Sequence, residues 1–179
     1  MATRFSLGIL FLGLLLSLAA CCGSSTCDDC QDAHADAIYL QFSVDSSATG
    51  NGFRAAELDT IQLIRQAVSE KVTPRRDTTR IVLRRTAVAD SIRLDRTLPF
   101  PARDTLVTED YTYSILLPNA KPAQRYELTD VNIEGSFEAD GCCTCYRNRV
   151  KTLQLDGRPL DLTDPAGNNG IVPIRLTRK

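Results

Sequence analysis

The chain has 179 residues and carries 21 Lys and Arg against 22 Asp and Glu, a formal net charge of −1. This balance excludes a strongly basic nucleic-acid-binding protein, and the length excludes a large multidomain assembly. Because 43% of the residues are apolar, the chain has the material for one globular domain with a hydrophobic core. It does not have the composition of a disordered protein.

Residues 1–20 have the pattern of an export signal. Arg4 is their one charged residue, an apolar stretch follows from Phe5 to Leu16, and small residues end the segment at Ala20. This pattern is typical of a secretory signal peptide, and the apolar stretch is shorter than the ~20 residues that a membrane-spanning helix needs. We therefore expect residues 1–20 to be removed after export.

The residues at the expected cleavage point predict a lipid anchor. Leu18-Ala19-Ala20-Cys21 resembles the lipobox of bacterial lipoproteins, a resemblance that covers residues 1–21 alone. It implies that Cys21 receives a diacylglyceryl group, that cleavage precedes Cys21 and that the new amine is acylated. Two or more acyl chains anchor a protein stably to a membrane.

The resemblance also indicates a location in the cell envelope. Position 22 is Cys22 and not the Asp that retains lipoproteins in the inner membrane. We therefore expect the outer membrane rather than the inner one, with the protein facing the periplasm or the cell surface. The membrane partner is then reached through the lipid at Cys21.

Residues 21–36 are expected to form a lipidated, flexible tether. After Cys21 the segment is rich in small residues and Asp, has no Lys or Arg, and shows neither a helical nor a strand period. Such a composition is typical of a spacer. We expect a single folded domain over residues 37–179.

The pattern of this domain is that of β-strands. Apolar and polar residues alternate from Ile38 to Val44, and a helical turn at 54–57 precedes an expected strand at 59–66. Further strands are expected at 80–84, 91–96, 111–117, 126–128, 131–133, 151–155, 158–162 and 171–176. Asp156-Gly157 favours a type I′ hairpin turn, and Pro173 places the last strand at an edge or a bulge.

Short strands separated by turn signals predict an all-β fold. The favoured architecture is an antiparallel β-sandwich of about eight strands, Ig-like or transthyretin-like. A small β-barrel is the alternative. Tyr111 and Tyr113 lie two residues apart, hence on one face of a strand, and are expected to pack in the core or across strands.

Seven cysteines are present, and six remain when Cys21 carries the lipid. An even number in an exported protein favours disulfides. These cysteines form two clusters, at 22–30 and at 142–145. A bond between the clusters would close a long loop and stabilise the folded chain by about 4–5 kcal/mol. The second cluster follows the loop 138–141, and we expect it between two strands at the end of the sandwich that the tether enters. The disulfide candidates are Cys22, Cys27, Cys30, Cys142, Cys143 and Cys145.

A thiolate metal site is the alternative use of these cysteines. Cys27 and Cys30 have the Cys-x-x-Cys spacing of half a tetrahedral zinc site. Cys142 and Cys145 would complete it, with His34 as a substitute ligand, and Cu(I) would also suit soft thiolates. Redox chemistry at Cys27-x-x-Cys30 is disfavoured, because no strand precedes the motif to place it at a helix N-terminus.

Two other stretches carry groups that could bind ligands. Residues 71–96 hold eight Lys and Arg against three Asp, a possible anion-binding face for sugar acids or lipid phosphates. Arg is abundant throughout the chain, however, so a solvated strand face is favoured. Oxygen ligands for Ca²⁺ occur at Asp161, Asp164, Asn168 and Asn169. Their spacing fits no EF-hand, and ordinary turn chemistry is favoured.

Catalysis is not expected. His34 is the one histidine and lies in the expected tether, so a Ser-His-Asp triad lacks its base. The sequence therefore predicts a non-enzymatic envelope lipoprotein, a lipid-tethered β-sandwich cross-linked by disulfides. It would act as a binding or structural module for an envelope protein or polysaccharide, not for nucleic acid. The alternatives are a Zn- or Cu-binding envelope lipoprotein and an envelope hydrolase that uses carboxylates without a recognisable motif.

Overall fold

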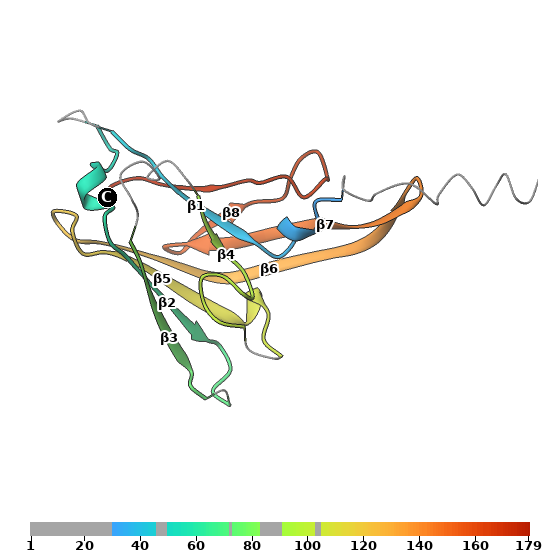
Figure 1. Ribbon diagram of the computed structural model, residues 1–179, viewed down its shortest axis with the longest axis horizontal. Coiled ribbons are helices and arrows are strands. Elements are labelled where there is room, and N and C mark those ends of the chain that lie inside the picture. Colours follow the sequence, from blue (N-terminus) through green and yellow to red (C-terminus); the bar gives the residue numbers. More distant parts are fainter. Residues whose placement is uncertain (1–29, 46–49, 72, 83–90, 103–104) are drawn as a thin grey trace, which may run out of the picture.

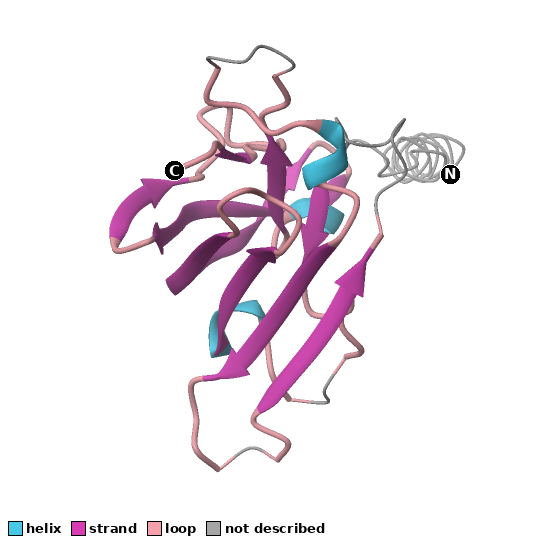
Figure 2. Ribbon diagram, turned by 90° about the vertical axis from the view of Figure 1, so that its left-hand side faces the viewer, coloured by secondary structure: helices cyan, strands magenta, loops and turns pink. Residues whose placement is uncertain are grey.

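The computed structural model describes residues 30–45, 50–71, 73–82, 91–102 and 105–179. The expected signal peptide and three of the cysteines, Cys21, Cys22 and Cys27, lie outside the described residues. The described part is all-β, as predicted, with short 3₁₀ helices before the first strand and between later strands (Figures 1 and 2). Its strands form two sheets, of six and three strands, rather than one closed barrel.

The larger sheet has the strand order β3-β2-β5-β6-β7-β8, and the smaller has the order β4-β1-β9. All pairs in the larger sheet are antiparallel, whereas β1 in the smaller sheet is antiparallel to β4 and parallel to β9. The strands are β1 (Ile38–Phe42), β2 (Ile61–Ala67), β3 (Arg76–Ile81), β4 (Ile92–Leu94), β5 (Tyr111–Leu117), β6 (Gln124–Asp140), β7 (Cys143–Leu155), β8 (Arg158–Asp161) and β9 (Ile174–Leu176). The 3₁₀ helices are η1 (Asp32–His34), η2 (Ala55–Glu57) and η4 (Thr108–Asp110).

The longest feature is the hairpin of β6 and β7. The two strand pieces expected at 126–128 and 131–133 are parts of one 17-residue strand, and β7 is also longer than expected, with 13 residues. A register shift between Thr129 and Asn132 interrupts the apolar alternation, and Asp130 has a positive φ of 51° there. Apolar alternation therefore predicted two short strands, although the backbone pairing of β6 with β7 continues on both sides of the interruption.

The strand expected at 80–84 is shifted. β3 lies at Arg76–Ile81 instead, and Val82 after it is 68% exposed. The reason is that β3 is an edge strand whose residues are alternately exposed and half-buried, so its sequence is mostly polar. This strand is formed by backbone pairing with β2, and its sequence has no apolar alternation from which it could be predicted.

The turn between β7 and β8 confirms the predicted hairpin. Asp156 and Gly157 have φ values of 51° and 78°, and a type I′ turn requires positive φ at both central residues. The Asp156 amide also donates to the carbonyl of Glu127 on β6, at 2.8 Å. The turn is therefore fixed to the neighbouring strand.

The hydrophobic core contains side chains of both sheets. Leu40, Ile115 and Leu128 are fully buried in it. Tyr111 and Tyr113 are 2% and 3% exposed, which confirms that they pack inside. Burial of this apolar surface is the main force that holds the two sheets together.

A buried arginine connects β2, β3 and the segment before β5. Arg65 is 1% exposed, and its guanidinium lies 2.9 Å from the Asp77 carboxylate and 2.6 Å from the carbonyl of Pro101. The rings of Phe100 and Tyr111 lie 4.8 and 4.6 Å from the guanidinium carbon. A buried cation needs such partners, because desolvation without them costs several kcal/mol.

We predict that Asp77→Ala lowers the free energy of unfolding by about 3 kcal/mol, because it leaves the Arg65 charge buried without its carboxylate. Urea unfolding of the disulfide-intact chain measures this loss. Glu70→Ala is the matched control, since it removes a carboxylate that pairs with an exposed Arg75 at 3.4 Å and is expected to cost less than about 1 kcal/mol. Equal losses in the two variants would contradict the role assigned to Asp77.

Candidate functional site

A disulfide joins the first described residue to the turn end of the β6–β7 hairpin. Cys30 and Cys145 are bonded across a sequence separation of 115 residues, with their Cα atoms 5.2 Å apart. Cys142 and Cys143 each take part in a disulfide as well. Sulfurs in this oxidised state are not the thiolates that a metal site needs. Of the four cysteines in the metal-site hypothesis, Cys30, Cys142 and Cys145 are therefore oxidised, and Cys27 lies outside the described residues.

The second cysteine cluster does not lie in a loop between strands, as expected from the sequence. Cys143 and Cys145 belong to β7, and pair with Asp140 and Glu138 of β6. The turn contains only Gly141 and Cys142. The expectation was wrong because polar residues, paired through their backbones, continue the ladder to the very end of the hairpin.

Residues 30–36, here called the N-terminal segment, pack against the domain and are not a free tether. Four side chains bind its backbone carbonyls, and one of them, Lys151, is described below. Asn148 donates to Ala35 at 2.7 Å, Arg93 to Ala33 at 2.6 Å and Thr108 to Asp36 at 3.0 Å. These hydrogen bonds attach residues 33–36 to the domain, although the sequence pattern places the start of the domain at residue 37. The composition of the segment gave no sign of these contacts, because the donors come from distant parts of the chain.

Side chains also cover the free edge of β7. β8 pairs with β7 only from Thr152 onward, so the edge is open between Tyr146 and Asn148. The Tyr146 amide donates to the Asp32 carboxylate at 2.9 Å, and the Asn148 amide donates to Asn169 at 2.8 Å. The Asn169 side chain also donates to the Tyr146 carbonyl. These groups take the place of a further strand and satisfy buried backbone groups.

The loop that offered oxygen ligands for Ca²⁺ is held by turn chemistry. The Asp164 carboxylate accepts hydrogen bonds from the amides of Ala166, Gly170 and Asn168, and these bonds lower its pKa. Asp161 accepts from Thr163 at 2.8 Å. Among the described residues, no group of three or more His, Cys, Asp and Glu is placed to hold a metal ion.

Lys151 is a site residue that the sequence did not reveal. Its side chain is 8% exposed, and its ammonium donates to the carbonyl of His34 at 2.8 Å. Burial lowers the pKa of Lys151 to about 8, while Asp36 acts to raise it and Arg93 to lower it. The His34 ring contacts the Tyr39 hydroxyl at 2.5 Å. Lys151 lies on the same face of β7 as Leu153 and Leu155, so strand alternation alone predicts an inward direction, but nothing in the sequence indicates that η1 covers its ammonium group.

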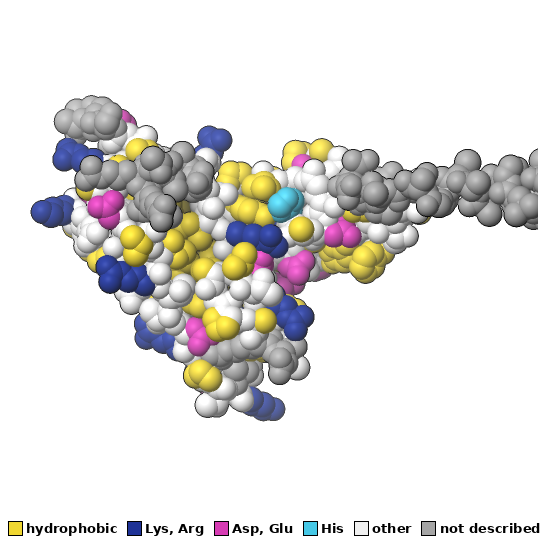
Figure 3. All heavy atoms as spheres, viewed as in Figure 1, with side chains coloured by type: hydrophobic (Ala, Val, Ile, Leu, Met, Phe, Trp, Pro, Cys, Tyr) yellow, Lys and Arg dark blue, Asp and Glu magenta, His cyan; other side chains and the backbone are white. Residues whose placement is uncertain are grey.

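The basic stretch 71–96 does not form one anion-binding face. Arg76 and Arg80 lie on β3 in the larger sheet, whereas Arg93 lies on β4 in the smaller one. Arg84 and Arg85 lie outside the described residues. Figure 3 shows Lys and Arg side chains scattered over this view of the surface. Their distribution favours the solvated surface over an anion site.

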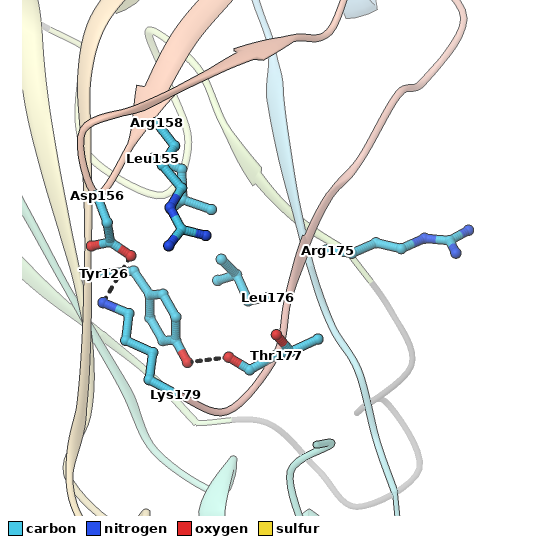
Figure 4. Close-up of a pocket in the computed structure, with 8 residues that line it drawn as sticks. All are labelled: Tyr126, Leu155, Asp156, Arg158, Arg175, Leu176, Thr177 and Lys179. Carbon is cyan, nitrogen blue, oxygen red and sulfur yellow. Dashed lines mark hydrogen bonds and ion pairs between the residues drawn. The ribbon is translucent and has the colours of Figure 1, made fainter. Parts of the chain in front are cut away.

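A hollow of about 390 Å³ lies at the opposite end of the β6–β7 hairpin (Figure 4). Its lining residues are Tyr126, Leu155, Asp156, Arg158, Arg175, Leu176, Thr177 and Lys179. The Arg158 guanidinium points into the hollow and Arg175 points away from it. Asp156 pairs with Lys179 at 2.7 Å, which leaves the Arg158 guanidinium as the group that could receive a small anion.

The Tyr126 hydroxyl in this hollow is not an acid–base group at neutral pH. It donates to the Thr177 carbonyl at 2.6 Å, and burial raises its pKa to about 12. The phenol therefore stays protonated and holds β6 against the chain after β9. The geometry of the hollow suits binding better than proton transfer.

Comparisons with known protein families, with curated proteins and with solved structures find no match for this chain. Within the ranges that the structure describes, no helix is both long and apolar enough to cross a membrane. Function is therefore inferred from the chain's own residues and their geometry.

We predict that Lys151 makes the protein more stable as the pH rises from about 8 to about 10. The pKa of Lys151 is about 8 in the folded chain and 10.5 when unperturbed. The unfolded chain therefore binds more protons between these values, and the free energy of unfolding increases with pH by up to about 3 kcal/mol. At lower pH, where both states are protonated, the contribution is constant.

Urea unfolding at intervals from about pH 7 to pH 10 tests this expectation. Lys151→Met is the control, because it removes the titrating group, keeps a long apolar side chain and leaves all other groups in place. The wild-type chain should gain stability relative to this variant over the interval. Parallel curves would contradict the lowered pKa.

Proposed function

We propose that this chain is a lipid-anchored protein of the bacterial cell envelope that presents a disulfide-cross-linked β-sandwich as a binding or structural module. The observation that carries the proposal is the Cys30–Cys145 disulfide. It fastens the chain that follows the lipobox-like residues 18–21 directly to β7 of the larger sheet. The oxidised state of Cys142 and Cys143 favours this function over a thiolate metal site.

The short spacing between lipid and cross-link supports an anchoring role. Cys30 follows Cys21 by nine residues, and a fully extended chain of that length spans at most about 30 Å. The domain would therefore stay close to the membrane surface. A pull on the lipid would act on β7 through a covalent bond, and not on the weaker contacts of residues 30–36.

The opposite end of the sandwich is the place for a ligand. β7 has 13 residues between Cys143 and Leu155, which corresponds to about 40 Å at ~3.3 Å per residue. The hollow beside Leu155 would thus face away from the anchored end. Arg158 suits the carboxylate or phosphate groups of an envelope polymer. We propose the outer membrane as the location, with the domain in the periplasm or at the cell surface.

We predict that Cys21→Ser abolishes lipidation in a bacterial host. The serine hydroxyl does not replace the thiol in the acyl transfer, so labelled fatty acid should enter the wild-type chain and not the variant. Intact mass should show that the variant keeps residues 1–20. Cys22→Ser is the matched control and should still carry the label. Labelling of Cys21→Ser at the wild-type level would overturn the lipid anchor.

We also predict that Cys30, Cys142, Cys143 and Cys145 resist alkylation in protein taken from its native envelope fraction. The protein is unfolded without reductant, alkylated and weighed as an intact chain, because a disulfide sulfur does not react. The same sample treated with reductant is the control, and should take up label at all four positions. Alkylation of these cysteines without reductant would instead show free thiols, and metal analysis would follow.

A further inference from the structure

An exposed aromatic side chain lies near the end of the β6–β7 hairpin. Phe137 is 69% exposed, the highest value among the large hydrophobic side chains that are exposed in the described residues. It pairs with Tyr146 directly across the ladder, and the two ring centroids are 5.2 Å apart in an edge-to-face arrangement. Phe137 therefore stands on a rigid two-stranded support and not on a loop.

The hairpin places this ring beside the point where the N-terminal segment is attached. Tyr146 is the neighbour in sequence of Cys145, which is bonded to Cys30. In Figure 1 the turn end of β6 and β7 extends beyond the rest of the sandwich. Phe137 thus lies about one strand position from the covalent attachment, at an end that projects from the domain.

The chain length between lipid and cross-link limits how far this end can lie from a membrane. If Cys21 carries the lipid, as proposed above, the nine residues to Cys30 keep the hairpin within about 30 Å of the lipid. A short linker gives the tethered group a high effective concentration at its target. A contact too weak to bind a membrane by itself is then populated.

The carboxylate that follows Phe137 in the sequence is paired with two arginines. The neighbouring Glu138 carboxylate lies 3.1 Å from the Arg149 guanidinium and 4.0 Å from that of Arg147. These pairs offset its negative charge, so the carboxylate is not free to repel anionic headgroups. Tyr and Trp are favoured at the boundary between headgroups and acyl chains, and Phe is among the side chains that surface-bound segments bury there.

We infer that the end of the β6–β7 hairpin rests on the membrane that holds the lipid anchor, with the Phe137 ring in the headgroup region. This contact sets the orientation of the sandwich, because β7 then leads away from the surface. The Asp156–Gly157 turn and the hollow beside it lie at the far end. The inference rests on the proposed lipidation of Cys21 and adds the lipid surface as a partner of the hairpin.

A single-tryptophan variant tests the contact. The chain has no Trp, so Phe137→Trp introduces one reporter. The full processed chain is reconstituted in vesicles of phosphatidylethanolamine and phosphatidylglycerol, with and without brominated lipid. We expect a blue shift of the Trp emission on reconstitution and a loss of emission with brominated lipid.

Val82→Trp is the matched control. Val82 is 68% exposed and follows β3, where Ile81 pairs with Ile61 at the start of β2. The pairing of β2 with β5 and of β5 with β6 places this position at the end where β6 begins, away from the hairpin turn. Its emission should be unchanged by brominated lipid.

The outcomes separate this inference from the proposed function. Flotation of the vesicles is measured first, and a chain that does not float contradicts the lipid anchor itself. If the Phe137→Trp chain floats and its emission is not quenched, the hairpin contact is overturned and the anchor is left intact. Equal quenching in the Phe137→Trp and Val82→Trp chains would mean that the domain has no fixed orientation. A blue shift without quenching would mean that protein, and not lipid, covers the ring. Equal quenching and a blue shift without quenching would each overturn the inference.

Discussion

The Cys30–Cys145 bond is the constraint on which the turn end of the β6–β7 hairpin and the N-terminal segment depend. It closes a loop of 115 residues, and a cross-link across about 100 residues removes roughly 4–5 kcal/mol of loop entropy from the unfolded chain, in the chain-entropy model. With residue 30 fixed, residues 31–36 have little entropy left to lose. Hydrogen bonds worth about 1 kcal/mol each, such as Asn148 to Ala35 and Arg93 to Ala33, are then enough to hold the segment on the edge of β7.

Two buried cations show how the fold tolerates charge in different ways. Arg65 has a carboxylate, a carbonyl and two aromatic rings around it, and a guanidinium remains protonated in any protein. Arg65 ties β2 to β3 and to Pro101 through these contacts. Lys151 donates to a backbone carbonyl, and its pKa falls to about 8. An ammonium can lose its proton where a guanidinium cannot, so the contact of β7 with His34 is the titratable one.

The sequence predicts those elements whose burial alternates along the chain. β5 and the Asp156–Gly157 turn follow from apolar alternation and from positive φ, both of which are local properties. β3 and the outer parts of β6 and β7 do not, because backbone pairing of polar residues forms them. The cysteines could be recognised as site residues by type and spacing. Asp32, Lys151 and Asn169 could not, since their roles come from partners 21 to 117 residues away in the chain.

The β6–β7 hairpin relates the two ends of the molecule to each other. Gly135 marks a bulge in it, and a Cβ atom there would lie 2.3 Å from the Arg147 carbonyl, so the strands approach more closely than another residue allows. With its outer edge covered by Asp32 and Asn169, the hairpin is a rigid connection between the disulfide and the hollow. In the proposed function, the domain is attached through the lipid and the disulfide, both covalent. At ~0.1 M salt, attraction between exposed charges more than about 10 Å apart is largely screened, whereas covalent bonds are unchanged. The domain would therefore stay attached to the membrane at any ionic strength, within the reach that the linker between Cys21 and Cys30 allows.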